Sequence, residues 1–127
     1  MEIITTIDIG TTAVRIVAFD YLGNRVANKK GSYPTLHTQP DYSEQDPEQV
    51  FITVLFILKS FLNELQSSKK YKVKGLVFSS SMHSVLSIDK KGTPLGNAII
   101  WADNRAKNIA EEIKNSDIGN AIYHNTG

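Results

Sequence analysis

The sequence predicts an α/β fold in which a mixed β-sheet is flanked by helices. Three strand-like segments lie in residues 2–32, a long amphipathic segment spans 46–68, and another apolar strand-like segment follows at 73–81. A helix of this kind must bury its apolar stripe against a sheet, so a meander, a crossover helix and a returning strand indicate an α/β layer arrangement. The antiparallel start argues against a sheet built only from parallel βαβ units.

The meander is predicted from β-branched residues and turn signals. Residues 2–8 are rich in Ile and Thr and stop before Gly10. Residues 12–20 form a second strand candidate, and the Gly and Asn in 21–24 suit a tight turn. Residues 25–32 complete three antiparallel strands.

The segment after the meander has a clear helix start. Asp46 can accept hydrogen bonds from the free amides of the first turn, and Pro47 suits the first helical position. We expect the helix to end near Ser67 and Ser68. Its predicted apolar stripe contains Val50, Val54, Leu58, Phe61 and Leu65, widened by Phe51, Leu55 and Leu62 so that much of the helix is expected to be buried.

The remaining elements are shorter. We expect a buried strand at 73–81, strands at 85–89 and 98–101, a helix at 104–115, and a last helix from Asp117 to Tyr123.

Composition narrows the class of protein. The chain has 127 residues, 41% hydrophobic and 21% charged, with a formal net charge of +1 and no cysteine. Disulfides and thiolate metal sites are therefore excluded. The near-neutral charge argues against nucleic acid or an acidic membrane as partner. The longest apolar run, 50–58, is shorter than the roughly 20 residues that span a bilayer, so a cytoplasmic enzyme is the expectation.

The strongest local signal for chemistry is the turn after the first strand. Asp8 ends the strand, and Gly10, Thr11 and Thr12 form a tight turn with Arg15 following. Backbone amides and hydroxyls in such a turn can bind phosphate oxygens. The carboxylate could hold Mg²⁺ directly or through water, and the guanidinium could contact a phosphate. The alternative is a plain hairpin whose threonines merely suit a strand.

Two further clusters follow strand candidates. Met82 and His83 come after 73–81, and a histidine there can donate to a hydroxyl or carboxylate, or serve only structure. Trp101, the only tryptophan, can pack on the apolar face of a polyol. Asp103 can accept from hydroxyls or cap the next helix, and Arg105 can pair with Asp103 or meet an anionic substrate.

These segments together resemble the FGGY family of carbohydrate kinases, within the sugar kinase–Hsp70–actin superfamily. Residues 8–12 are similar to the family's first phosphate-binding motif. Residues 42–47 resemble its Trp-Ala-Glu-Gln-Asp-Pro segment, with Tyr and Ser in place of Trp and Ala, and we interpret them as a structural loop and cap. Residues 78–84 resemble the gluconate kinase branch, where Ser84 replaces the Gly of xylulose kinases. Residues 101–105 match Trp-x-Asp-x-Arg.

The resemblance implies a ribonuclease-H-like, actin-like ATPase fold, with 1–127 as the N-terminal portion of the first lobe and the second lobe absent. It implies ATP and Mg²⁺ as cofactors and a small sugar or sugar acid as substrate, most closely D-gluconate, which would give 6-phosphogluconate. The implied nucleotide and metal site contains Asp8, Gly10, Thr11, Thr12 and Arg15, with Asp8 on the metal. The implied substrate residues are Met82, His83, Trp101, Asp103 and Arg105.

No catalytic base is found in this chain, because the resemblance places the family's general-base Asp beyond Gly127. We therefore expect the isolated chain to be inactive. Three alternatives stay open. A xylulose or other pentulose kinase is the nearest competitor. A two-metal nuclease on the same core is less compatible with the near-neutral charge. A non-catalytic assembling module is the third, and self-association into a homodimer is left open.

Overall fold

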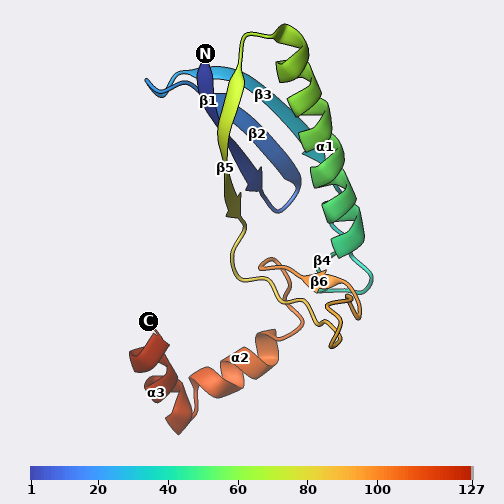
Figure 1. The fold of residues 1–127 in the computed structure, drawn as a ribbon. Helices are drawn as coiled ribbons and strands as arrows, with labels where there is room; N and C mark the ends of the chain where they lie inside the picture. Colours follow the sequence, from blue (N-terminus) through green and yellow to red (C-terminus); the bar gives the residue numbers. More distant parts are fainter. Residues whose placement is uncertain (127) are drawn as a thin grey trace.

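The computed structural model describes residues 1–126, and its sheet is mixed as predicted (Figure 1). The strand order is β3-β2-β1-β5, in which β1 pairs antiparallel with β2 and parallel with β5. A second sheet pairs β4 with β6. The elements are β1 (Glu2–Ile9), β2 (Ala13–Phe19), β3 (Arg25–Ser32), β4 (Glu44–Gln45), α1 (Pro47–Ser68), β5 (Lys72–Ser80), β6 (Ala98–Ile99), α2 (Lys107–Lys114) and α3 (Asp117–Thr126).

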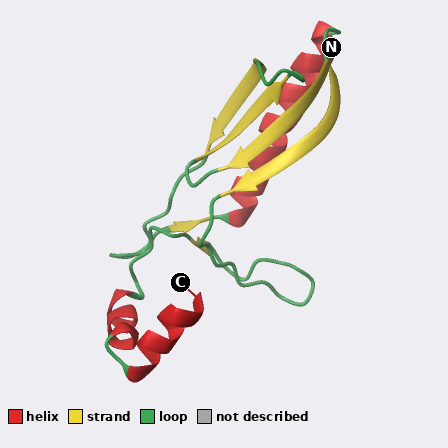
Figure 2. Cartoon of the chain, turned by 90° about the vertical axis from the view of Figure 1, so that its left-hand side faces the viewer, coloured by secondary structure: helices red, strands yellow, loops and turns green. Residues whose placement is uncertain are grey.

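The helix α1 covers one face of the four-stranded sheet (Figures 1 and 2). Side chains alternate between the faces of a strand, and residues paired across strands share a face. Ile7 pairs with Ile16 on the side of α1, whereas Asp8 pairs with Arg15 on the opposite face. The buried core between sheet and helix contains Ile3, Ile7, Val14, Ile16, Ala18, Tyr33, Val54, Ile57, Phe61 and Leu65.

The start of α1 confirms the predicted cap. The Asp46 carboxylate accepts from the amides of Glu48 and Gln49 at 2.9 and 3.3 Å, and Pro47 is the first helical residue. These bonds satisfy two of the amides that every helix start leaves unpaired. The helix ends at Ser68, followed by Lys69 in the left-handed conformation with φ 53°.

The predicted burial of α1 was too broad. Its buried residues are Val54, Ile57, Phe61 and Leu65, so Ile57 occupies the stripe position given to Leu58. Phe51 and Leu55, which were expected to widen the stripe, are exposed. The reason is geometric: one sheet face can cover only one side of a helix, and no other described segment packs on the far side.

The spacing between α1 and β3 depends on Gly31. A Cβ atom at this position would lie 2.4 Å from Ile57 Cγ1 and 2.8 Å from Ile57 Cδ1. Those distances are far below van der Waals contact, so glycine allows the helix to pack directly on the strand backbone.

The helix α1 is longer than the apolar run seen in the sequence. By length and composition alone it could cross a membrane, with a mean hydropathy of 1.4 over 18 residues. In this structure its stripe of Val54, Ile57, Phe61 and Leu65 packs into the core, which is the arrangement of an amphipathic helix on a sheet.

The predictions for the second half of the chain need several corrections. The strand expected at 98–101 is limited to Ala98–Ile99. The strand at 73–81 is present as β5 but is not buried, because it is the sheet edge beyond the reach of α1; Phe78 is 63% exposed. Residues 85–89 form no strand and make only isolated bridges, such as Val85 with Ile99. The helix predicted at 104–115 begins only at Lys107 and ends at Lys114.

The helices α2 and α3 lie beyond the small β4–β6 sheet, away from α1 (Figures 1 and 2). No residue of either helix is buried. The last helix extends from Asp117 to Thr126, three residues past the predicted end. The main hydrophobic core of this chain therefore lies between the four-stranded sheet and α1.

Replacing Phe61 by Ala should lower the free energy of unfolding by about 3–5 kcal/mol, because a fully buried ring leaves a cavity. Phe61 is 1% exposed, whereas Phe56 on the same helix is 70% exposed. Phe56→Ala is therefore the matched control and should cost less than about 1 kcal/mol. Urea unfolding followed by circular dichroism measures both, and equal losses would contradict the packing described above.

Candidate functional site

The turn after β1 is held by its own backbone and by Tyr33. The amide of Gly10 donates to the Ala13 carbonyl at 3.0 Å, and the amide of Tyr33 donates to the Thr12 carbonyl at 3.2 Å. The Tyr33 hydroxyl donates to the Gly10 carbonyl. Burial, with a smaller contribution from the Asp8 charge, raises the pKa of Tyr33, so its phenol stays a hydrogen-bond donor at neutral pH. Residues 10–12 are thus a fixed turn.

Asp8 and Arg15 lie side by side next to this turn, on the sheet face opposite α1. Arg15 Nη1 is 3.6 Å from Asp8 Oδ2, and the two side chains are 61% and 43% exposed. An ion pair this exposed contributes little to stability. Both groups therefore remain accessible to a ligand that arrives at the end of β1.

Thr11 is contacted by two segments that are distant in the sequence. The Trp101 indole nitrogen donates to the Thr11 hydroxyl at 2.9 Å, across 90 positions. The Gln45 side-chain amide donates to the Thr11 carbonyl. A hydroxyl that accepts one hydrogen bond still has its own hydrogen to donate. The turn after β1 and Trp101 are therefore in direct contact, as a shared site requires.

Met82 and His83 are placed at the same edge of the sheet by their flanking backbone. The amide of Ser81 donates to the Ile9 carbonyl at 2.9 Å, and Val85 exchanges two backbone hydrogen bonds of 2.9 Å with Ile99. His83 has a φ of 60°, which is uncommon for a residue with a side chain. Both side chains are exposed, and neither forms a side-chain hydrogen bond in the part of the chain described here.

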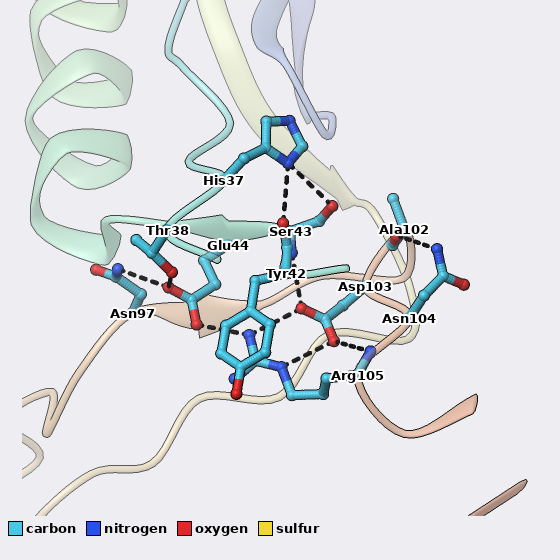
Figure 3. Close-up of polar contacts among 10 residues, drawn as sticks. All are labelled: His37, Thr38, Tyr42, Ser43, Glu44, Asn97, Ala102, Asp103, Asn104 and Arg105. Carbon is cyan, nitrogen blue, oxygen red and sulfur yellow. Dashed lines mark hydrogen bonds and ion pairs between the residues drawn. The ribbon is translucent and has the colours of Figure 1, made fainter. Parts of the chain in front are cut away.

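Asp103 and Arg105 belong to a polar cluster that joins two segments (Figure 3). Arg105 Nε and Nη2 donate to the two Asp103 carboxylate oxygens, each at 2.8 Å. Arg105 Nη2 also contacts Glu44 Oε1 at 2.5 Å. The amide of Ser43 donates to Asp103 Oδ2 at 2.7 Å. The Asp103 side chain is only 4% exposed, so this is an internal ion cluster.

The surroundings of the cluster satisfy its remaining polar atoms. The Arg105 guanidinium lies 3.6 Å from the centroid of the Tyr42 ring, a cation–π contact. Asn97 and Thr38 donate to Glu44 Oε2 at 3.0 and 3.2 Å. Hydrogen bonds from Arg105 hold the pKa of Asp103 well below its ordinary value, and Asn97 followed by Arg105 lowers that of Glu44. All three groups are charged at neutral pH.

This geometry excludes one role that the sequence left open for Asp103 and shows the ion pair that it left open for Arg105. Asp103 does not cap α2, because the helix begins at Lys107 after Ala106, which makes no side-chain cap bond. Arg105 pairs with Asp103 and with Glu44, so its charge is already neutralised by two carboxylates. Direct substrate contacts for Asp103 and Arg105 stay predictions, whereas their joining of two segments is structural fact.

The Asp8 carboxylate could provide a single protein ligand to a metal ion at this turn. Within residues 1–126, no group of three or more His, Asp or Glu side chains is arranged to hold a metal ion. Mg²⁺ accepts such sparse protein ligation, since phosphates and water commonly complete its coordination. The residues present therefore fit a Mg²⁺ ion that arrives with a phosphate ligand.

The sequence interpretation missed the part that Gln45 and Glu44 play in the site. Both lie in the segment interpreted as a loop and cap, yet both are buried and reach other segments. The sequence did contain a signal for this. Two long polar side chains stand directly before the helix cap, and the cap itself needs neither of them. Their partners, Thr11 and Arg105, are too distant in the sequence for local patterns to reveal.

Solved structures place this fold in a known class. The chain superposes on the crystal structure of gluconate kinase from Lactobacillus acidophilus with a TM-score of 0.83 and 32% identity, covering 97% of this chain and 24% of that one. The topology and the turn after β1 therefore define a ribonuclease-H-like domain of the actin-like ATPase class.

Sequence comparison gives the family. Residues 3–127 match the N-terminal domain of the FGGY family of carbohydrate kinases, and the chain belongs to that family. It is 38% identical to the xylulose kinase of Staphylococcus epidermidis over 104 residues, which are 82% of this chain and 21% of the relative. It is 35% identical to the gluconokinase of Bacillus subtilis over 121 residues, 95% of this chain and 23% of the relative. The chain thus spans less than a quarter of the length of these relatives.

Because of the ion cluster, the free energy of unfolding should depend on pH in the acid range. The folded-state pKa values of Asp103 and Glu44 are depressed, so their contribution is complete above the ordinary carboxyl range and is lost as pH falls through the folded-state values. Asp103→Asn should therefore be less stable than the wild type at neutral pH, and the difference should shrink as pH falls from about 5 towards 2. Urea midpoints across this range measure it.

Glu111→Gln is the control for this series, because Glu111 forms no ion pair among the residues described and lies exposed on α2. Its urea midpoint should follow that of the wild type at every pH. A stability difference for Asp103→Asn that stays constant with pH would contradict the role assigned to the carboxylate.

Proposed function

We propose that this chain is the N-terminal portion of the first lobe of an ATP-dependent carbohydrate kinase that converts D-gluconate to 6-phosphogluconate. The observation that supports it most directly is the 2.9 Å hydrogen bond from Trp101 to Thr11. It joins a turn suited to phosphate with an aromatic side chain suited to a polyol. Such a kinase needs both in one place, since phosphoryl transfer depends on positioning and charge stabilisation.

The nucleotide side of this site is formed by the turn after β1. The amides and hydroxyls of Gly10, Thr11 and Thr12 would bind phosphate oxygens, and Arg15 would add a cationic contact. Asp8 would hold Mg²⁺ directly or through water, and that ion would neutralise charge on the transferred phosphoryl group. Arg15 is free enough for this role because its pair with Asp8 is long and exposed.

The sugar side is formed by Trp101, Met82 and His83. The indole is 62% exposed while its nitrogen is held by Thr11, so its face is available for the apolar side of a polyol. His83 is the better candidate for the substrate carboxylate, because Arg105 is already paired with two acids. Asp103 and Arg105 would then act on the substrate mainly through the segments they hold.

The catalytic base would come from polypeptide beyond Gly127, as would the rest of the nucleotide site. We therefore propose that residues 1–127 alone bind but do not turn over substrate, and that the whole enzyme acts in the cytoplasm on a small molecule.

A pentulose such as xylulose is the second candidate substrate. It is favoured by the named xylulose kinase relative, whose identity of 38% over 104 residues compares with 35% over 121 for the gluconokinase. The gluconate assignment instead rests on Ser84, which follows Met82 and His83 where xylulose kinases are expected to carry Gly. Assays with both substrates discriminate between the two candidates.

Coupled ADP-release assays of the complete natural polypeptide, with gluconate, xylulose and glycerol, test the substrate. We expect kcat/KM for gluconate to exceed that for xylulose by roughly ten-fold or more, since one added charged contact supports such discrimination. The separate chain of residues 1–127 should show no turnover. A higher value for xylulose would overturn the gluconate assignment but leave the kinase assignment standing.

Asp8→Asn should lower kcat/KM of the complete polypeptide by roughly 10²–10³-fold, because it weakens the hold on the metal at the transferred phosphate. Glu2→Gln is the matched control: Glu2 lies at the other end of β1 in an exposed pair with Lys74. That change should leave kcat/KM nearly unaltered. Activity of Asp8→Asn within about two-fold of the wild type would exclude Asp8 from the metal site.

A further inference from the structure

The phosphate turn is contacted from two sides by segments that are themselves locked together. Gln45 follows residues 36–44 and reaches the Thr11 carbonyl, while Trp101 lies in the segment 97–105 and reaches the Thr11 hydroxyl. No other side chain in the structurally described part of the molecule bonds to Thr11. The orientation of the Thr11 carbonyl and hydroxyl therefore depends on both segments at once.

Backbone pairing joins residues 41–45 to residues 98–104. Glu44 and Gln45 pair with Ile99 and Ala98 in the β4–β6 sheet. The amide of Ile100 donates to the Ser43 carbonyl at 3.2 Å, and the amide of Asn104 donates to the Asp41 carbonyl at 2.8 Å. Backbone bonds thus align the segments.

Side chains close this connection through a single cation. Arg105 bonds Asp103 on its own segment and Glu44 on the other, directly before Gln45. Asp103 in turn accepts from the Ser43 amide. Removing the guanidinium would leave the Asp103 and Glu44 carboxylates close together without the cation that bonds to both, and their repulsion would push the segments apart.

We propose that Gln45 and Arg105 are positioning residues for the phosphate turn: Gln45 orients Thr11 directly, and Arg105 fixes the two segments that carry Gln45 and Trp101. This inference rests on the proposed kinase function of the site. Neither residue needs to touch nucleotide or sugar. Their effect would be to hold the Thr11 hydrogen in the direction of an incoming phosphate oxygen, so that little ordering remains to be done when nucleotide binds.

The arrangement also connects the two substrates. Trp101 belongs to the proposed sugar wall and at the same time bonds to the phosphate turn. A sugar that packs on the indole and restricts its motion would also restrict Thr11, and so raise the affinity for nucleotide. By thermodynamic linkage, bound nucleotide would raise the affinity for the sugar by the same factor. Loss of Arg105 should weaken this coupling, whereas a purely structural residue would lower stability and leave it unchanged.

The first test is kinetic and uses the complete polypeptide. Gln45→Leu should raise KM for MgATP by roughly 5–10-fold, as expected for one lost hydrogen bond, with KM for the sugar within about two-fold. Arg105→Met should raise both KM values and reduce their mutual dependence, and Arg105→Lys should restore part of the loss. Gln49→Leu and Arg25→Met are matched controls, because both side chains are exposed and form no hydrogen bond or ion pair within residues 1–126.

The second test does not need activity. Trp101 is the only tryptophan of this 127-residue chain, so its fluorescence reports on the contact with Thr11. Thr11→Val, Gln45→Leu and Arg105→Met should each increase acrylamide quenching by about two-fold, since each loosens the indole, and Arg25→Met should not. Far-ultraviolet circular dichroism checks folding, and Gln45→Leu carries the test if Arg105→Met unfolds.

The two tests separate the possible failures. Increased quenching without any sugar phosphorylation would retain the positioning roles and overturn the proposed function. Unchanged quenching in a folded Gln45→Leu variant would overturn the positioning roles whatever the enzyme does. Lower thermal stability with unaltered KM values would also overturn them, because it would show that Gln45 and Arg105 serve only the fold.

Discussion

The site depends on one constraint: two segments distant in the sequence form hydrogen bonds with the carbonyl and the hydroxyl of Thr11. The turn after β1 would exist without them, because Gly10 and Tyr33 already close it. The hydrogen bonds from Gln45 and Trp101 orient the carbonyl and hydroxyl of Thr11. A threonine at an exposed turn samples several side-chain rotamers, whereas one whose hydroxyl accepts from a fixed indole has its hydrogen left for a ligand. The role proposed for Thr11 in binding a phosphate oxygen follows from that orientation.

The fold supplies this constraint from its most stable part. The strand β1 is central in the sheet, between β2 and β5, and its buried residues pack under α1. Asp46 then caps α1 immediately after Gln45, so the helix start fixes where the Gln45 amide can reach. By contrast, β5, α2 and α3 are largely exposed and make no comparable core. The precision of the site therefore comes from β1 and α1.

The sequence predicted those elements whose signal is local. The meander, the Asp46 cap and the helix end near Ser68 are each encoded by neighbouring residues, and all are confirmed. Burial was predicted less well, because it depends on which segments meet: Phe51 and the strand at 73–81 are apolar yet exposed. The strand expected at 85–89 does not form for a related reason. An apolar segment becomes a strand only where a neighbouring strand can pair with it, and residues 85–89 make only isolated bridges.

The candidate site shows the same division. Asp8, Gly10 and Thr11 could be proposed from a motif because strand, acid and turn are consecutive, and their roles stay predictions until tested by binding. Asp103 and Arg105 could not be assigned in the same way. Each is chemically able to meet a sugar, and only their distances to Glu44 and Ser43 reveal that their charges are already used inside the protein. A carboxylate with a strongly depressed pKa and almost no exposure is a poor acceptor for a weakly acidic hydroxyl, because a sugar would have to displace a cation. The same tight pairing lets the cluster hold the two segments in place, because its geometry does not depend on a ligand. Only a few side chains are then needed to contact the ligand itself.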